Sequence, residues 1–308
     1  MNDMKKLFIA IALAVITAMS ANAQASLVQE NDYESFSSVN ISDDFIVKLN
    51  SSDKYSVKTI SDERISPFVT CYVKNGVLYV SLDRKSFTPE LRKQLKAKGA
   101  AKPVLEVEVY FPTIKSLEMS ENTNLQISDL IRAENFTLVL KDKAKVNKIN
   151  FEGETAEINL SKGAYANIEA TTSKTLYVTT ENSAQAIVKH FGNAISIVAS
   201  GSSMQNVESE VVNMNADLSG GSTVEVRGSA AKLQVKGAGT SRLTAEALAA
   251  DNASVEQSGS SKCHVNVSGN ILVNLTGGSM LTFMGKPTIE VDRIVNSTLI
   301  KHDDPRRK

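Results

Sequence analysis

The amino-acid sequence predicts an all-β protein folded as a right-handed single-stranded β-helix, a β-solenoid with about 20 residues per coil. Three observations predict this fold. A motif recurs at that spacing, apolar residues alternate with polar ones on both sides of it, and small residues occupy the corner between. A fixed period in this range is typical of a solenoid, and parallel crossover connections are right-handed by strong preference.

The stretch Asn213–Val226 (NMNADLSGGSTVEV) contains one repeat unit: a strand, a corner at Ser219–Ser222, and a second strand. The spacing of successive corners ranges from 17 to 22 residues. Because the strands keep their length, we expect this variation to lie in the return segment, as loops. The corners are numbered from the residues equivalent to Ser219, which are Ser120, Lys141, Ser161, Thr180, Ser200, Ser219, Lys236, Ser258, Thr276 and Ile294.

Apolar residues form columns in this register. The position three residues before the corner is apolar in all ten repeats, and the positions five and seven residues after it are mainly apolar, with polar residues between them. Period-2 alternation on both sides of the corner predicts two half-buried strands per coil. Three residues into the corner every side chain is small, as stacking at about 4.8 Å requires. Gly or Asn often precedes it and tolerates positive φ.

The chain divides into four predicted parts. Residues 1–23 form a signal peptide, with Lys5 and Lys6 before an apolar run and Ala21-Asn22-Ala23 as the cleavage signal. Residues 24–300 form a single β-helix domain, with N-terminal coils or a cap at 30–115 and regular coils at 116–300. Residues 301–308 form a flexible tail. We expect an exported protein of the periplasm, cell surface or extracellular space, with no integral membrane span after cleavage.

Within residues 30–115 the pattern leaves open whether the solenoid continues or is capped. Asn50–Asp53 reads as a corner, and Asn75-Gly76 as the turn of a coil or hairpin. A short helix is predicted near residues 88–98, with Thr88 as N-cap and Pro89 at the first helical position. Leu105–Phe111 (LEVEVYF) returns to strand.

Charge and motif content exclude several classes of function. The chain has 34 basic and 34 acidic residues, and loss of two lysines and one aspartate with the signal peptide leaves 32 and 33. A near-neutral protein has no electrostatic basis for binding nucleic acid. No nucleotide-binding, metal-ligand or nucleophile motif occurs, so we predict no catalytic residues, no cofactor and no metal. Cys71 and Cys263 are about nine coils, roughly 40 Å, apart, too far for a disulfide.

Two groups of charged residues remain to be interpreted. Glu225, Arg242 and His264 occupy the same outward position of three consecutive coils in this register, which would place them about 4.8 Å apart in a line. We interpret them as an exposed binding face; a charge ladder without function and a lyase or hydrolase site are the alternatives. Lys148 breaks an inward column of a lysine-rich coil and predicts a register shift there.

The repeated corners ASGSS (199–203), LSGGS (218–222), QSGSS (257–261) and LTGGS (275–279), with the closing GKPTIEVDRIVNSTLIK, resemble the DUF2807 family. The likeness runs from about Phe36 to Lys301, and the corners SENT, KDKA and SKGA depart from it. The resemblance implies a right-handed β-helix with an adhesin-like role, in a family described as "putative auto-transporter adhesin, head GIN domain" and abundant in Bacteroidetes. It supplies no catalytic residues.

The leading hypothesis is an exported, non-enzymatic β-helix that acts as a surface or periplasmic binding or structural module. Its expected partners are a glycan or an extracellular or envelope protein, bound on the outward columns or the return loops. One alternative is a carbohydrate-active enzyme on the same scaffold. The other is a partner in envelope assembly or signalling, as a homo-oligomer through a coil face.

Overall fold

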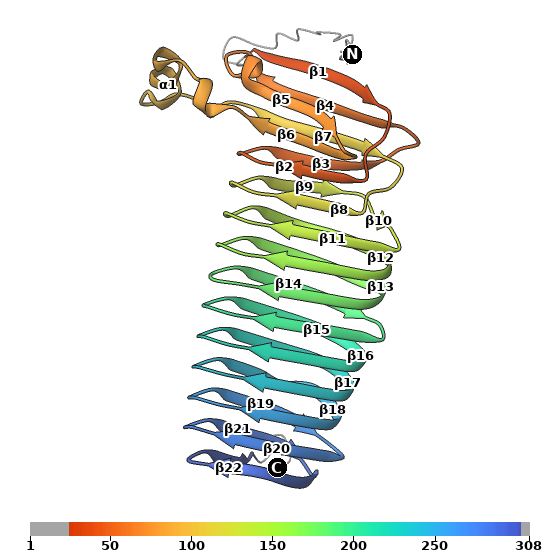
Figure 1. The fold of residues 1–308 in the computed structure, drawn as a ribbon, viewed down its shortest axis with the longest axis vertical. Coiled ribbons are helices and arrows are strands. Elements are labelled where there is room, and N and C mark those ends of the chain that lie inside the picture. Colours follow the sequence, from red (N-terminus) through yellow and green to blue (C-terminus); the bar gives the residue numbers. More distant parts are fainter. Residues whose placement is uncertain (1–24, 303–308) are drawn as a thin grey trace, which may run out of the picture.

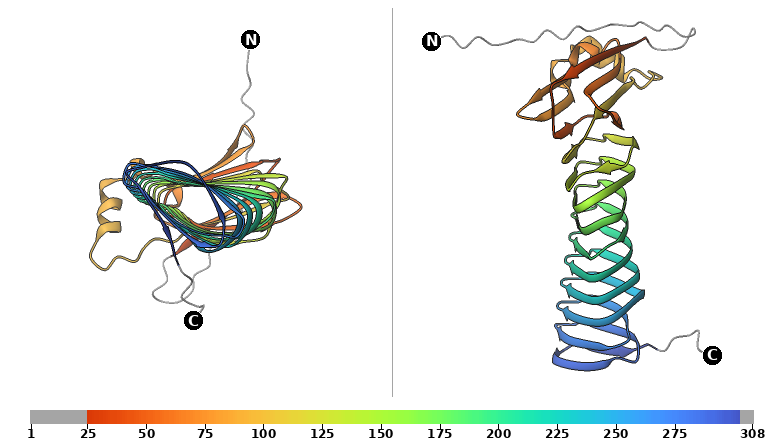
Figure 2. Two further views of the ribbon diagram at one scale, coloured as in Figure 1. Left: turned by 90° about the horizontal axis from the view of Figure 1, so that it is seen from below. Right: turned by 90° about the vertical axis from the view of Figure 1, so that its right-hand side faces the viewer.

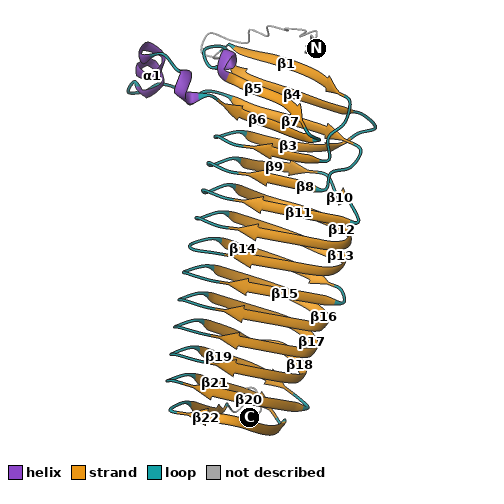
Figure 3. Cartoon of the chain, in the orientation of Figure 1, coloured by secondary structure: helices purple, strands orange, loops and turns teal. Residues whose placement is uncertain are grey.

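The computed structural model describes residues 25–302, which form one tall stack of β coils with a cap at the N-terminal end (Figure 1). Strands make up almost all of the regular structure, and the helical segments lie near the N-terminal end (Figure 3). This confirms the predicted solenoid.

The bounds of the elements follow the chain from cap to end coil. They are β1 (Ser26–Tyr33), β2 (Ser38–Ile41), β3 (Ile46–Ser51), β4 (Tyr55–Asp62), the 3-10 helix η1 (Ser66–Phe68), β5 (Val69–Lys74), β6 (Val77–Leu82), the 3-10 helix η2 (Arg84–Ser86), α1 (Pro89–Lys96), β7 (Leu105–Phe111), β8 (Ser116–Met119), β9 (Asn124–Ser128), β10 (Ile131–Arg132), β11 (Asn135–Leu140), β12 (Lys145–Leu160), β13 (Tyr165–Thr180), β14 (Gln185–Phe191), β15 (Ala194–Ala199), β16 (Met204–Leu218), β17 (Thr223–Gly237), β18 (Arg242–Gln257), β19 (Lys262–Val267), β20 (Asn270–Thr276), β21 (Met280–Gly285), β22 (Thr288–Val295) and β23 (Thr298–Lys301).

Each coil pairs in parallel with the coils above and below it, so like positions stack on like positions. Along β16 and β17, for example, Val224 lies beside Gln205 and Val226 beside Val207. The end-on view shows the coils as flattened, nearly superimposed loops around one core (Figure 2). That core is continuous along the stack because no single coil can bury its own apolar column.

The hydrogen-bonded register corrects three of the ten predicted corner positions. The residues equivalent to Ser219 are Glu181 rather than Thr180, Ala238 rather than Lys236, and Val295 rather than Ile294. With these corrections the coil length varies only from 18 to 21 residues, which is narrower than the sequence spacing indicated.

The corner has one constant backbone feature. Its second residue has positive φ in every coil from residue 120 onward, and the set is Glu121, Asp142, Lys162, Asn182, Gly201, Gly220, Gly239, Gly259, Gly277 and Asn296. In three of these coils, whose corners are SENT, KDKA and SKGA, the third residue also has positive φ, at Asn122, Lys143 and Gly163. Two consecutive positive values are typical of a type I′ turn and one of a type II′ turn. The departing corners are therefore a second turn class within the same fold.

The small residues predicted at the fourth corner position are confirmed and buried. Ser222 is fully buried, and its hydroxyl donates to the carbonyl oxygen of Ala199 in the coil above at 3.0 Å. Ser203, Ser241, Ser261 and Ser279 make the same kind of bond to the preceding coil. These hydroxyls hydrogen-bond to backbone carbonyls, so they satisfy groups that would otherwise be buried without a second partner.

The return side does not carry the predicted loops. In β12, β13, β16, β17 and β18 the chain runs through this side as one strand of 15 or 16 residues. Close backbone approach keeps the side tight, since a Cβ on Gly228, whose φ is +116°, would lie 2.1 Å from the carbonyl oxygen of Ser209. Lys148 falls in a register shift of β12, as predicted, and Ile149 takes the inward place.

Residues 30–115 both continue the solenoid and cap it. β2 and β3 pair in parallel with β8 and β9, so the first coil precedes a long insertion. Within that insertion β6 and β7 stack in parallel on β2 and β3. β4 then runs antiparallel to β7, and β5 runs antiparallel to β6 in the predicted hairpin. Because β4 and β5 run antiparallel to their neighbours, they do not continue the parallel stacking of coils, and the solenoid ends here.

The helix α1 replaces the corner of the topmost coil, between β6 and β7. Thr88 caps it as predicted, accepting a hydrogen bond from the Leu91 amide at 3.2 Å, and Pro89 occupies the first turn. α1 projects sideways from the stack (Figure 1).

The remaining sequence predictions concern the ends and the cysteines. The predicted signal peptide lies outside the described residues, whereas β23 extends the last coil through Lys301. Cys71 lies in β5 of the cap and Cys263 in β19 near the other end of the stack, both as free thiols. Cys263 sits in the inward column between Leu243 and Leu281, whereas the sequence register put Ser241 beside it.

Candidate functional site

The predicted line of Glu225, Arg242 and His264 is wrong, because the residue at its centre is Thr244, two residues after Arg242. Glu225 pairs with Thr244, and Thr244 pairs with His264, so the glutamate and the histidine share an outward column with a threonine between them. Arg242 lies in the neighbouring column, between Thr223 and Lys262. The structure therefore separates the arginine from the other two. The His264 Nδ1 atom instead lies 3.2 Å from a carboxylate oxygen of Glu246.

The error came from the corner assigned to this coil. The true corner, Ala238-Gly239-Thr240-Ser241, has Gly in second place and Ser in fourth, like Ser258-Gly259-Ser260-Ser261 one coil below. Placing the corner by that four-residue pattern, rather than at Lys236-Gly237, gives the correct register. The column that contains Glu225 and His264 runs through Asn167, Ile187, Asn206, Glu225, Thr244 and His264.

A polar depression of about 480 Å³ lies over the upper part of this column, and we call it the coil hollow. It spans five consecutive coils. Its lining comes from β12, β13, β14, β16 and β17, mainly from outward positions beside the buried Val188 and Val207. The lining residues are Lys148, Asn167, Glu169, Ile187, Val188, Lys189, Asn206, Val207, Glu208, Glu225 and Arg227. Ile187 was predicted to face inward, but it is 42% exposed here and Val188 takes the buried place.

Ion pairs fix the long side chains of the coil hollow. Lys148 lies 2.7 Å from Glu169, and Glu208 accepts from Arg227 at 2.6 Å and lies 3.5 Å from Lys189. The Arg227 guanidinium lowers the pKa of the Glu208 carboxyl below its ordinary value, and Lys189 adds to the effect. Glu225 has no ion-pair partner within residues 25–302, so its carboxylate is available to a ligand.

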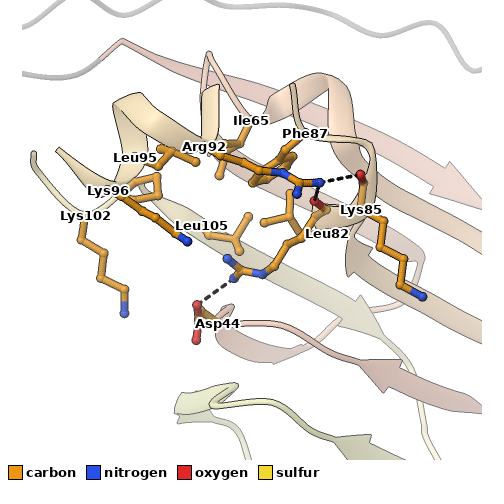
Figure 4. Close-up of a pocket in the computed structure, with 12 residues that line it drawn as sticks. Asp44, Ile65, Leu82, Lys85, Phe87, Arg92, Leu95, Lys96, Lys102 and Leu105 are labelled. Atoms are coloured by element: carbon orange, nitrogen blue, oxygen red, sulfur yellow. Dashed lines mark hydrogen bonds and ion pairs between the residues drawn. The ribbon is translucent and has the colours of Figure 1, made fainter. Parts of the chain in front are cut away.

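A second hollow of about 490 Å³ lies beneath α1, and we call it the α1 hollow. Long-range strand pairing brings its walls together from the β2–β3 corner, β6, α1 and the start of β7. Apolar side chains form its floor and cationic ones its rim (Figure 4). The lining is Asp44, Ile65, Leu82, Arg84, Lys85, Phe87, Arg92, Leu95, Lys96, Lys102, Pro103 and Leu105. No local sequence pattern pointed to this site.

The described part of the chain contains no group of three or more His, Cys, Asp or Glu side chains placed to hold a metal ion. His190 is fully buried, with Nδ1 2.8 Å from the carbonyl oxygen of Ala170 and Nε2 3.1 Å from that of Ala194. Burial lowers the pKa of His190, and these two contacts oppose the shift. This histidine belongs to the core and faces neither hollow.

The chain is similar to several proteins of solved structure and matches one family model. No curated protein matches the chain. Between residues 25 and 302, no helix has the length and apolar character needed to cross a membrane. Two crystal structures titled "putative adhesin" are similar: one from Parabacteroides merdae, with 12% identity over 90% of this chain and 96% of that chain and a TM-score of 0.45, and one from Parabacteroides distasonis, with 15% identity over 90% and 97% and the same TM-score.

A third crystal structure, titled "Putative lipid binding protein" and also from Parabacteroides distasonis, has 14% identity over 90% of this chain and 96% of that chain, with a TM-score of 0.46. A family model described as "Putative auto-transporter adhesin, head GIN domain" matches residues 35–191 and 177–287. These ranges span most of the solenoid, and they confirm the resemblance carried by the Ser-Gly corners. The chain belongs to the DUF2807 family.

Proposed function

We propose that the protein is an exported, non-enzymatic binding module that holds a glycan chain in the coil hollow. The observation that carries the proposal is the column Asn167, Ile187, Asn206 and Glu225. Its residues stand on successive coils about 4.8 Å apart, and three of the four carry an amide or a carboxylate group. Amide and carboxylate groups donate and accept the hydrogen bonds that sugar hydroxyls need. The exposed Ile187 offers an apolar surface for the C–H face of a sugar ring.

The shape of the surface favours a glycan over a peptide. An extended peptide commonly binds by adding a strand to an exposed sheet edge. The coil hollow lies on the face of paired strands, whose backbone groups are already used between coils. Only side chains are offered there, so a ligand with many hydroxyl groups along its length fits better than one that depends on main-chain bonds.

The electrostatics of the coil hollow argue against hydrolysis. A glycosidase needs one carboxylic acid held protonated as the general acid and a second carboxylate at a defined separation. Glu169 and Glu208 are each ion-paired with cations, and the pKa of Glu208 is lowered rather than raised. This environment favours ionised carboxylates that accept hydrogen bonds, as a binding surface requires.

A glycan array, followed by calorimetry with the best ligand, tests the proposal. We expect Asn206→Ala and Glu225→Ala each to weaken binding about tenfold, the effect of one lost hydrogen bond to a charged or amide group. Glu256→Ala is the matched control, since Glu256 is exposed on the strand before the corner and lies outside the coil hollow. Absence of any glycan ligand, or equal binding by all three variants, contradicts the proposal.

The C-terminal end favours a second role, self-association. β22 is the last strand of its face, and its inward residues Ile289, Val291 and Ile294 are 37%, 52% and 39% exposed. An antiparallel twofold pairing of β22 with a second copy would set Glu290 opposite Arg293 and Ile289 opposite Ile294. The same contacts then occur twice, as a twofold interface requires.

Light scattering of the chain without its signal peptide tests this pairing. We expect a dimer that Glu290→Arg disrupts and that the double variant Glu290→Arg/Arg293→Glu restores, because the swap rebuilds both ion pairs. The substitution Glu181→Arg changes the net charge equally at an exposed corner after β13, far along the stack from β22, and should leave the dimer intact. A monomeric wild-type protein, or disruption that the double variant does not relieve, would show that the end coil has no such partner.

A further inference from the structure

 The α1 hollow combines an apolar floor with an excess of positive charge. Leu95 is half-buried and packs against the core, whereas Ile65, Leu82 and Leu105 are 1%, 5% and 5% exposed. Five cationic side chains line the hollow, against the single carboxylate of Asp44. An apolar pocket with a few convergent polar groups is the usual form of a small-molecule site.

Not all of this positive charge is neutralised within the protein. Arg84 is ion-paired with the loop beneath it, because its guanidinium lies 3.2 Å from a carboxylate oxygen of Asp43 and 2.7 Å from one of Asp44. Arg92 donates to the carbonyl oxygens of Arg84 and Lys85, which holds α1 in place but leaves its charge uncompensated. In the described structure, neither Lys96 nor Lys102 has a carboxylate partner. Figure 4 shows these two lysines on the side of the hollow away from Lys85.

We propose that the α1 hollow binds a single-chain amphiphilic anion, with its aliphatic chain on the floor of Ile65, Leu82 and Leu105 and its carboxylate or phosphate headgroup at Lys96 and Lys102. Charge complementarity selects the headgroup, since an anion near unpaired cations gains an interaction that a neutral group lacks. The volume of about 490 Å³ is in the range of small-molecule pockets, which suits one chain rather than a patch of bilayer. This site and ligand are separate from the coil hollow and its glycan.

Calorimetry on the mature protein tests the proposal with octyl phosphate and octanoate, each below its micellar concentration. Octyl glucoside, which has the same chain and no charge, and inorganic phosphate, which has no chain, are the comparison ligands. We expect both anionic octyl compounds to bind more tightly than either comparison ligand. Binding should strengthen roughly fourfold for each methylene added from hexyl to octyl phosphate, the effect of burying one CH₂ group.

The variant Lys96→Gln/Lys102→Gln locates the headgroup. We expect it to weaken octyl phosphate binding about tenfold, since each exposed pair contributes up to about 1 kcal/mol. The control is Lys93→Gln/Lys98→Gln, which removes the same charge from residues outside the lining. Both pairs are exposed, so neither variant should affect folding. Equal effects of the two variants would overturn the proposal, as would equal affinity for octyl glucoside or inorganic phosphate. Binding only to vesicles that contain phosphatidylglycerol would assign the charge to a membrane surface and would also overturn it.

Discussion

The two glycines of the corner Ser219–Ser222 differ in what they allow, and this difference predicts a large contrast between neighbouring substitutions. Gly220 has φ of +67°, and a Cβ added there would lie 3.0 Å from the carbonyl oxygen of Gly201 in the coil above. Gly221 lacks a positive φ, and its nearest neighbours would lie 3.6 and 3.7 Å away, which is ordinary contact. We therefore expect Gly220→Ala to destabilise the solenoid and Gly221→Ala to be tolerated.

The magnitude follows from three terms. A left-handed backbone costs a residue with a Cβ roughly 1–2 kcal/mol. The close approach to Gly201 adds to this, because the coil above must shift. Replacing Gly by Ala also restricts the unfolded chain, which stabilises the folded state by about 0.4–1 kcal/mol. Gly220→Ala should thus lower the free energy of unfolding by about 1–2 kcal/mol, whereas Gly221→Ala should be neutral or raise it by up to about 1 kcal/mol.

Urea unfolding followed by far-ultraviolet circular dichroism measures both variants against the wild type. A shift of the midpoint at constant slope reports a change in stability rather than in the surface exposed. The expected order of midpoints is Gly220→Ala, then wild type, then Gly221→Ala, with the last two close together. Equal midpoints for the two alanine variants would refute the steric account of the corner, since both residues occupy the same turn.

Substitutions at three further residues probe the core. Burial lowers the pKa of His190, so the unfolded chain binds a proton at this residue more readily than the folded chain does. The free energy of unfolding should therefore fall as the pH drops below about 6.5. Urea titration at several pH values measures this profile, and His190→Gln should flatten that part of it. Cys263→Ser should cost about 1–3 kcal/mol in the same assay, because it places a hydroxyl in an apolar column, and a cost near zero would contradict the inward placement. Ser222→Ala should cost about 0.5–1.5 kcal/mol through loss of the hydrogen bond to Ala199, whereas Ser222→Leu should cost more because the stacked corner has no room for a larger side chain; equal costs would contradict the packing argument.

The sequence was sufficient to predict the solenoid because each coil repeats the same physical constraints. Parallel stacking requires an apolar residue above an apolar residue and a small corner residue above a small one, so the pattern recurs even when identities differ. The hairpin turn at Asn75-Gly76 and the cap of α1 at Thr88 were also predictable, because both depend on local backbone chemistry. Strand direction in the cap was not, since antiparallel pairing of β4 with β7 depends on contacts far apart in the chain.

The register errors have a physical cause that also explains the error in the site. A slip of one residue exchanges the two faces of a strand, so it leaves a visible trace: Tyr177 and Ile187, taken as inward, are exposed. A slip of two residues keeps the alternation and passes unnoticed. The coil numbered from Lys236 instead of Ala238 slipped by two, and this alone placed Arg242 between Glu225 and His264. The α1 hollow was beyond prediction because strand pairing joins residues as distant as Asp44 and Leu105.

The unlike ends of the solenoid limit what assembly it can form. If both ends offered parallel coil edges, copies would add head to tail, and such a contact continues into a filament unless the rotation closes. Within residues 25–302, the N-terminal end is occupied by the antiparallel strands β1, β4 and β5, and the apolar coil edge lies at the C-terminal end. Two copies that meet through β22 use up both such edges. Association through this end therefore stops at a dimer, and the cap and the α1 hollow of each copy then lie at the two far ends of the pair.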